Sequence, residues 1–271
     1  MNNIKAFIIA LALPCLFTSL LTAQSSITKT FPINNSSAVE IEFQYGDIEI
    51  VKHNGSDVII EGDIQVNGKQ GAEHFTFDTE KNGTTMILKS AADFDEVDKR
   101  LTVIMNDGKK IFKEEGNLTI QDISDDENVD KVYNGIDIDA KFIVKIPSNI
   151  DLKAKTIYGN LMIKDYWQDM VIHSTYGSVD ALIKNSTNAP VMKISSTYSD
   201  VDVTIPESTN AALKLTTDYG SIYTDLDLNP EFKTSSNKRH HGQDISAKLN
   251  SGKGSITLDA TYSNIYLRKS L

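Results

Sequence analysis

The stretch that decides the fold lies in the second half of the chain. Residues 170–181 read Met170-Val171-Ile172-His173-Ser174-Thr175-Tyr176-Gly177-Ser178-Val179-Asp180-Ala181. Apolar or small residues alternate with polar ones on both sides of a Tyr-Gly pair. Because successive side chains of a β-strand point to opposite faces, this alternation predicts two short strands, each with one buried face, joined at a corner.

Copies of this stretch recur about every twenty residues, which is the signature of a repeat architecture. They occupy residues 152–163, 192–203, 213–224 and 256–267, and an isolated relative occupies residues 39–50. A degenerate copy at 247–258 overlaps the last one. The predicted corner residues are Tyr45, Gly46, Tyr158, Gly159, Tyr176, Gly177, Tyr198, Ser199, Tyr219, Gly220, Gly254 and Tyr262.

One such strand pair cannot bury its apolar face alone, so the copies are expected to stack, each on the one before it. The predicted fold class is therefore all-β, a parallel β-helix or solenoid with rungs of about twenty residues. Glycine suits a corner that needs a tight bend or a positive φ, although Ser199 and Ser263 weaken a strict requirement. Because the tyrosines share the parity of the buried positions, an internal ladder is favoured over an exposed platform for sugar rings.

Residues 24–135 are rich in expected strands but follow the repeat less closely than residues 136–271. Alternating segments predict strands at 57–66, 75–78, 84–89 and 136–147, with Asn-Gly turns at 54–55, 67–68 and 82–83. We expect irregular early rungs or a small sheet that caps the repeats. The acidic segment 122–130, which is poor in apolar residues, is expected to be an exposed loop.

Residues 1–23 are predicted to be a signal peptide, because a short apolar run ends at the small residues Thr22 and Ala23. The run is too short, and lacks the flanking charges, for a transmembrane anchor. Cys15 is the only cysteine, and Pro14 disfavours processing as a lipoprotein. We therefore expect export to the periplasm, the cell surface or the medium, and a mature chain without disulfides, thiol chemistry or a transmembrane span.

Charge narrows the choice of partners. The formal net charge of −10 disfavours capture of nucleic acid or anionic lipid. A polar insertion at residues 229–243 carries basic side chains and is a candidate partner-binding loop, with a plain solvated loop as the alternative. Its candidate contact residues are Lys233, Lys238, Arg239, His240 and His241.

No motif identifies an active site. The acidic groups within 93–98 and 122–130 lack the spacing of a calcium loop, and adjacent histidines at 240–241 point apart on a strand. Carboxylate pairs at 200/202 and 225/227 share a strand face, as polysaccharide cleavage would need, but no concentrated cluster surrounds them. We expect no catalytic residue, no resident metal and no cofactor.

Two segments, residues 146–159 and 205–220, each begin with Ile-Pro and end with Tyr-Gly. They resemble sequences of the bacterial domain family of unknown function DUF4097. That resemblance covers residues 136–271 and extends to 39–50, whereas residues 68–135 do not follow it. It implies a β-solenoid fold and the adhesin label that the family provisionally carries. It transfers no catalytic residue to this chain.

Together these features predict an exported, non-enzymatic β-solenoid that acts as an adhesin or as an envelope-associated binding or scaffold protein. The expected partner is a glycan or an envelope protein, and the oligomeric state stays open. The alternative is a polysaccharide-cleaving enzyme on the same scaffold. A groove lined by converging carboxylates would favour that alternative, whereas flat and evenly polar faces would favour a binding module.

Overall fold

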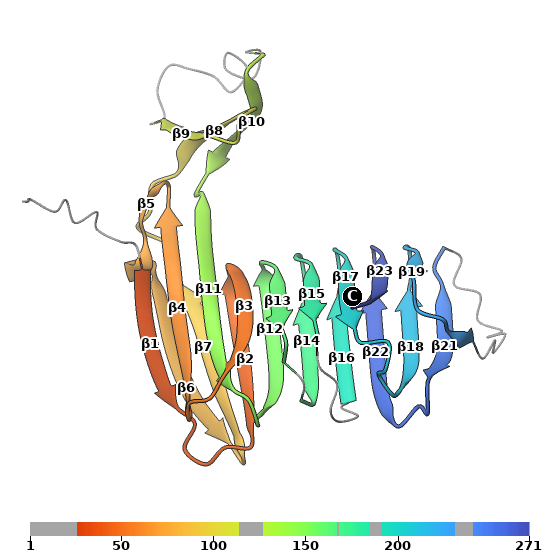
Figure 1. Ribbon diagram of the computed structural model, residues 1–271. Helices are drawn as coiled ribbons and strands as arrows, with labels where there is room; N and C mark the ends of the chain where they lie inside the picture. Colours follow the sequence, from red (N-terminus) through yellow and green to blue (C-terminus); the bar gives the residue numbers. More distant parts are fainter. Residues whose placement is uncertain (1–25, 114–126, 167, 185–190, 231–240, 271) are drawn as a thin grey trace, which may run out of the picture.

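The structure is a computed structural model that describes residues 26–113, 127–166, 168–184, 191–230 and 241–270. Within these ranges the chain is all-β, as predicted, and its one helical turn is the 3₁₀ helix η1 (Ala72–His74). The strands form two ten-stranded sheets and one three-stranded sheet (Figure 1). No helix in the described part of the chain is long and apolar enough to span a membrane.

The two large sheets face each other across one core. Sheet A contains, in spatial order, β1 (Ser26–Pro32), β4 (Asp57–Val66), β11 (Ile138–Pro147), β3 (Asp47–His53), β13 (Leu161–Lys164), β15 (Val179–Leu182), β17 (Val201–Ile205), β23 (Ile265–Lys269) and β19 (Ile222–Thr224), with β5 (Lys69–Gln70) beside β4. Sheet B contains β20 (Asn229–Pro230), β21 (Asp244–Leu249), β18 (Ala211–Thr217), β22 (Gly254–Ala260), β16 (Val191–Ser196), β14 (Met170–Ser174), β12 (Asp151–Tyr158), β2 (Ala38–Tyr45), β7 (Thr85–Ala92) and β6 (Phe75–Asn82).

Each repeat contributes one strand to sheet B and the next strand to sheet A, and we call such a pair a rung. Neighbouring rungs pair in parallel and in register. In sheet B, Ile172 pairs with Ala154 on one side and Ile194 on the other. All three side chains are fully buried. The alternation seen in the sequence therefore joins the apolar faces of successive rungs into one continuous core.

The rungs do not stack in chain order throughout. The last rung, β22 with β23, lies between the rung of β16 with β17 and the rung of β18 with β19 (Figure 1). The expectation that each copy lies on the one before it is therefore wrong for the last two rungs. The final strands of the chain consequently occupy an internal position in both sheets.

The degenerate copy at residues 247–258 is not a rung. Its first strand, β21, runs antiparallel to β18, and sheet B ends with β21 and β20 beyond it. Gly254 was predicted to occupy a corner, but it is the first residue of β22 and pairs with Ala211, so that prediction is wrong. Its N–H donates to the carbonyl of Asn210 at 2.9 Å, which makes it the start of a strand.

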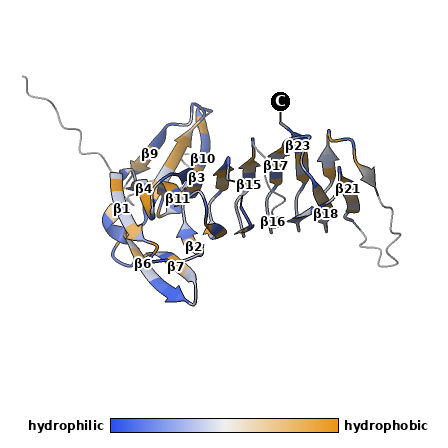
Figure 2. Ribbon diagram, turned by 60° about the horizontal axis from the view of Figure 1, so that its bottom comes forward, coloured by the Kyte–Doolittle hydropathy of each residue, from blue (hydrophilic) through white to orange (hydrophobic). Residues whose placement is uncertain are grey.

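The N-terminal strands extend both sheets. The predicted strands at 57–66, 75–78, 84–89 and 136–147 correspond to β4, β6, β7 and β11, and the isolated copy at 39–50 forms the rung of β2 with β3. Figure 2 shows the remaining rungs as a row that leaves this broader end. A three-stranded sheet of β8 (Arg100–Met105), β9 (Lys110–Lys113) and β10 (Val129–Gly135) projects from the same end (Figure 1).

Candidate functional site

Six tyrosines from six rungs form a stacked column along one corner of the rungs. Adjacent ring centroids lie 4.9–5.3 Å apart, with interplanar angles of 2–16°. In spatial order the column contains Tyr45, Tyr158, Tyr176, Tyr198, Tyr262 and Tyr219. Phe94 packs edge-on against Tyr45 at one end, and the His241 ring stacks on Tyr219 at the other, with centroids 5.9 Å apart.

The column runs outside the core, which corrects the expectation of an internal ladder. Tyr176 is 51% exposed, whereas Ser174 is fully buried. The strand ends at Ser174, so the alternation that made the tyrosines appear buried does not continue through the corner. Stacking covers the faces of the inner rings and leaves their edges in solvent. The inner tyrosines therefore offer no free ring face to a sugar.

Close backbone approach explains the corner glycines. A Cβ built on Gly159 would overlap the carbonyl oxygen of Gly46, and one on Gly177 would overlap that of Gly159. Only Gly46 of the corner glycines has a positive φ, at 105°. Of the two expected reasons for glycine, a tight bend or a positive φ, the positive φ does not apply to Gly159, Gly177 and Gly220, where the neighbouring rung excludes a side chain.

A buried hydroxyl supports each of two neighbouring corners. The Ser174 hydroxyl donates to the carbonyl of Gly159 at 3.1 Å and accepts from the N–H of Gly177 at 3.0 Å. The Ser196 hydroxyl does the same in the next rung, with the carbonyl of Gly177 at 2.9 Å and the N–H of Ser199 at 3.1 Å. These bonds satisfy backbone groups where the strand ladder is interrupted.

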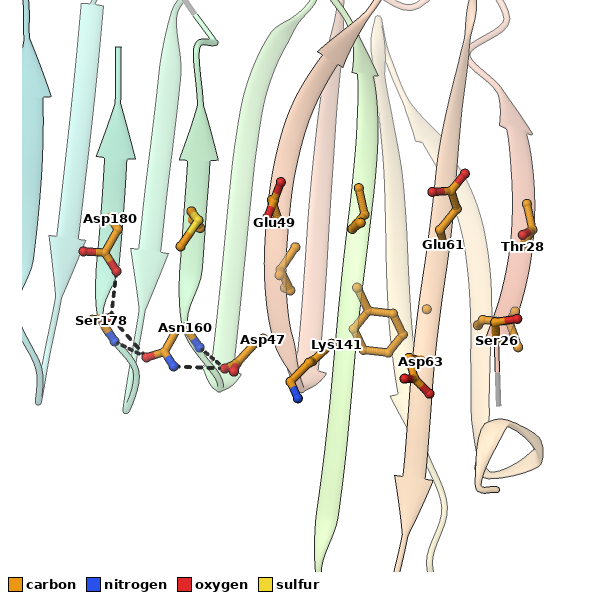
Figure 3. Close-up of a pocket in the computed structure, with 16 residues that line it drawn as sticks. Ser26, Thr28, Asp47, Glu49, Glu61, Asp63, Lys141, Asn160, Ser178 and Asp180 are labelled. Carbon is orange, nitrogen blue, oxygen red and sulfur yellow. Dashed lines mark hydrogen bonds between the residues drawn. The ribbon is translucent and has the colours of Figure 1, made fainter. Parts of the chain in front are cut away.

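A second column of short polar residues follows the corner, two positions after each tyrosine. Asp47 accepts hydrogen bonds from the backbone and side-chain amides of Asn160 at 2.9 and 3.0 Å. The Asn160 side-chain oxygen in turn accepts from the N–H of Ser178 at 2.8 Å. Asp200 repeats this role toward the N–H of Asn264 at 2.9 Å. Figure 3 shows the first part of this column at the edge of a pocket.

The pocket lies over the part of sheet A that contains the N-terminal strands, and it has a volume of about 690 Å³. It crosses six neighbouring strands, β1, β4, β11, β3, β13 and β15. Part of its lining is apolar, with the buried residues Ile48 and Phe142 and the partly exposed Ile143 and Met162. A cavity of this size falls in the range of small-molecule and side-chain binding sites.

Gly62 in β4 accommodates a core side chain beneath the pocket. A Cβ at this position would lie 2.8 Å from a ring carbon of Phe142 and 3.1 Å from a side-chain carbon of Ile27. Any other residue would therefore need these neighbours to move. The missing side chain leaves room for the Phe142 ring on the core face of the sheet, whereas Glu61 and Asp63 line the pocket from the opposite face of the same strand (Figure 3).

The lining carries more acidic than basic groups. Its carboxylates are Asp47, Glu49, Glu61, Asp63 and Asp180, and its one cationic side chain is Lys141. Two of the carboxylates have cationic partners from outside the lining, because Glu61 pairs with Lys145 at 2.5 Å and Glu49 with Lys164 at 2.8 Å. The pocket therefore combines an apolar lining with an excess of negative charge.

The hydrogen bonds of Asp47 and Asp180 come from neutral donors. Asp47 accepts from Asn160, as described above, and Asp180 accepts from the Ser178 hydroxyl at 3.1 Å. These bonds leave the charge of each carboxylate in place. Burial raises the pKa of Asp180, and the nearby carboxylates of Asp202 and Asp200 add to that rise, whereas the Ser178 hydrogen bond and the Arg268 guanidinium oppose it. A cation beside Asp180 would relieve this repulsion.

The candidate partner-binding loop, residues 229–243, lies mostly outside the described residues. Lys233, Lys238, Arg239 and His240 lie there, as do the predicted signal peptide and Cys15. His241 is described, and it stacks on Tyr219. The acidic segment 122–130 is described only from residue 127 onward.

The carboxylate pairs at 200/202 and 225/227 do not line the pocket. Asp202 forms a bidentate pair with Arg268, whose Nε and Nη2 lie 2.7–3.0 Å from its oxygens. Asp225 accepts from the N–H of Lys269 at 2.8 Å. In the 93–98 group, Asp93 accepts from the N–H of Asp95 at 3.0 Å. Among the described residues, no group of three or more acidic, His or Cys side chains is placed to hold a metal ion.

Sequence reasoning missed the pocket residues, although one signal for them was present. Each of the six tyrosines of the column is followed two positions later by Asp, Asn or Ser, and the first three of these residues line the pocket. Glu61, Asp63 and Lys141 carry no such signal. They belong to strands outside the repeat, and only the pairing of β4 with β11, and of β11 with the rung strand β3, brings them to the pocket.

The fold resembles a solved structure of a protein from Clostridium sporogenes that is provisionally described as a cell adhesion protein. The identity is 12% and the TM-score 0.56, over 90% of this chain and 99% of that one. A Bacteroides fragilis protein that is provisionally described as an adhesin matches at 11% identity and a TM-score of 0.28, over 90% of this chain and 97% of that one. The first likeness shows a shared fold.

No family model matches the chain, and no curated protein matches it. No family model therefore supports the resemblance to DUF4097, although the Clostridium sporogenes protein is itself provisionally described as a cell adhesion protein.

Proposed function

We propose that this chain is an exported, non-enzymatic, adhesin-like protein whose rungs form a parallel β-solenoid. The outer surface of sheet A would bind a glycan or a protein of the cell envelope. The in-register parallel pairing of five successive rung neighbours in each sheet supports the solenoid assignment. Export rests on the predicted signal peptide at residues 1–23.

The observation that carries the binding proposal is the pocket over β1, β4, β11, β3, β13 and β15. It is an open hollow on the outside of a sheet whose inner face is packed in the core. Surface cavities with an apolar lining and a few polar groups are the usual form of a binding site. The fold shared with the Clostridium sporogenes protein is consistent with this use.

The carboxylates that line the pocket are the feature that a polysaccharide-cleaving enzyme would use. Such an enzyme needs one carboxylate as an acid and a second as a base or nucleophile. In the pocket, however, Glu49 and Glu61 are each held by a lysine, and the carboxylates that raise the pKa of Asp180 lie outside the lining. Binding is therefore the better interpretation.

The test is capture from envelope extracts by the immobilised chain, expressed with its own N-terminal segment so that the cell carries out any processing. Met162→Trp should block the pocket, because Met162 is 40% exposed and lines it. Val171→Trp is the matched control, since Val171 is 43% exposed on sheet B, away from the pocket.

We expect one envelope component to be retained by the native chain and by Val171→Trp, and lost with Met162→Trp. Equal retention by all three forms would show that binding occurs elsewhere. Release of new reducing or unsaturated ends from envelope polysaccharide by the native chain, and not by Met162→Trp, would support the enzyme instead.

A further inference from the structure

We infer that the pocket over sheet A binds an extended, lysine- or arginine-bearing protein segment with a cationic side chain at every third position. The inference deepens the proposed binding function and rests on it. Three observations support it: the charge of the residues that line the pocket, the apolar part of that lining, and the order of the strands that supply its carboxylates.

Charge sets the class of ligand. Five carboxylates and one lysine line the pocket, and the carboxylates still outnumber the cations when Lys145 and Lys164, the partners of Glu61 and Glu49, are counted. The chain as a whole has a net charge of −10. A cation gains from this field, whereas phosphate, sulfate or uronate groups are repelled. Lys141, near the centre of the lining strands, lies on β11 between the acidic strands β4 and β3 (Figure 3).

The shape of the lining indicates which kind of cation fits. Ile143 and Met162, which are 39% and 40% exposed, give apolar surface beside the carboxylates. Lysine and arginine side chains combine an aliphatic stem with a charged end, so the stem can lie on the apolar surface while the end meets a carboxylate. A small hydrated metal ion would leave that apolar surface unused.

The order of the strands gives the spacing. The carboxylates lie on β4, β3 and β15, which alternate with β11 and β13 across the sheet. Neighbouring strands are about 4.8 Å apart, so the acidic strands recur about every 9.6 Å. A polypeptide in the extended polyproline II conformation repeats every three residues, or about 9.3 Å. Cations at every third residue would therefore meet successive acidic strands.

The test uses a fluorescent peptide with the repeat Lys-Pro-Pro-Lys-Pro-Pro-Lys, titrated with the chain and followed by anisotropy. Its comparison peptide has the same composition with the three lysines adjacent. We expect the spaced peptide to bind at least tenfold more tightly. Its affinity should fall as ionic strength rises from about 0.1 M to about 1 M, because the screening length shortens from about 10 Å to about 3 Å.

Two substitutions probe the carboxylates while keeping their hydrogen-bond acceptors. Asp47→Asn and Asp180→Asn should each weaken peptide binding about fivefold, which corresponds to the loss of one partly exposed ion pair. Asp78→Asn is the matched control, since it removes the same charge from an exposed position on β6 of sheet B. Unchanged thermal unfolding of each variant confirms that the fold is intact.

Equal affinity for the two peptides, or unchanged binding with both pocket variants, would overturn the inference. So would binding of spermidine or of a glucosamine oligomer in the absence of peptide binding, because the ligand would then be a small polycation or an amino sugar. The proposed function fails separately: if Met162→Trp leaves extract capture intact while the spaced peptide still binds the native chain, a cation site exists but does not mediate attachment.

Discussion

The position of the last rung inside the stack can be tested by cross-linking. Thr257 in β22 pairs with Lys193 of β16 on one side and with Lys214 of β18 on the other. Paired residues on neighbouring parallel strands lie about 4.8 Å apart, whereas Lys193 and Lys214 are two strands apart, at about 9.6 Å. A disulfide tolerates Cα separations of about 4.4–6.8 Å, so only the neighbouring pairs can be joined.

The double variant Lys193→Cys with Thr257→Cys should therefore form a disulfide under mild oxidation, in a background that carries Cys15→Ser. The bond would close a loop of about 65 residues, for which the chain-entropy model gives up to about 4 kcal/mol of stabilisation at 25 °C. Mobility on non-reducing gels would report the bond. Urea unfolding with and without reductant would report the stabilisation.

The matched control is Lys193→Cys with Lys214→Cys. If the rungs are ordered as described, this pair should not cross-link within one molecule. Efficient cross-linking of this pair, together with failure of the pair that includes Thr257→Cys, would mean that the rungs stack in chain order. That result would refute the assignment of β22 and β23 to an internal position.

Three further predictions concern stability and pH. Gly177→Ala should lower the free energy of unfolding in urea by about 2 kcal/mol or more, because its Cβ would overlap a carbonyl oxygen of the neighbouring rung. Gly135→Ala should change this free energy little, since the nearest atom to its Cβ would be 3.8 Å away. Leu258→Ala should cost about 2–5 kcal/mol in the same assay, because Leu258 is fully buried in an internal rung, and a loss below about 1 kcal/mol would contradict that position. Burial, and to a smaller extent the charge of Lys155, lowers the pKa of His173 below 6.5. As the pH falls below about 6.5, the unfolded chain therefore takes up this proton before the folded chain does, and the free energy of unfolding should decrease. His173→Gln should remove this part of the pH dependence, measured as the difference between the unfolding free energies of the variant and the native chain.

The strands of the rungs were predictable because their burial follows a period of two. The positions Met170, Ile172 and Ser174 are buried as the alternation requires. The corner was less predictable, since the alternation ends where the backbone turns and the tyrosines leave the core. The role of the glycines likewise depends on the neighbouring rung, which one copy of the repeat does not reveal.

The order of the rungs was not predictable from the pattern. Every copy presents nearly the same buried positions, so any two copies can pair equally well by alternation alone. What separates them is that β21 pairs antiparallel with one side of β18, whereas the next strand, β22, pairs in parallel with its other side. Such an arrangement depends on tertiary pairing and has no local signature.

The pocket depends on the same tertiary pairing. Asp47 and Asp180 hold repeat positions that could have been aligned, but Glu61 and Lys141 come from strands without the repeat. The small residue Gly62 reads locally as an ordinary interruption of a strand. Only the position of Phe142 on the neighbouring strand shows that Gly62 leaves room for a core ring beneath the pocket.

The most direct test of the proposed binding surface is hydrogen exchange of the chain with and without its captured envelope component, read by mass spectrometry. Protection on binding is expected in β3, β4, β11 and β13, which line the pocket. Exchange in β14 and β16, on sheet B, should stay unchanged. Protection that is confined to sheet B or to the tyrosine column would contradict the account.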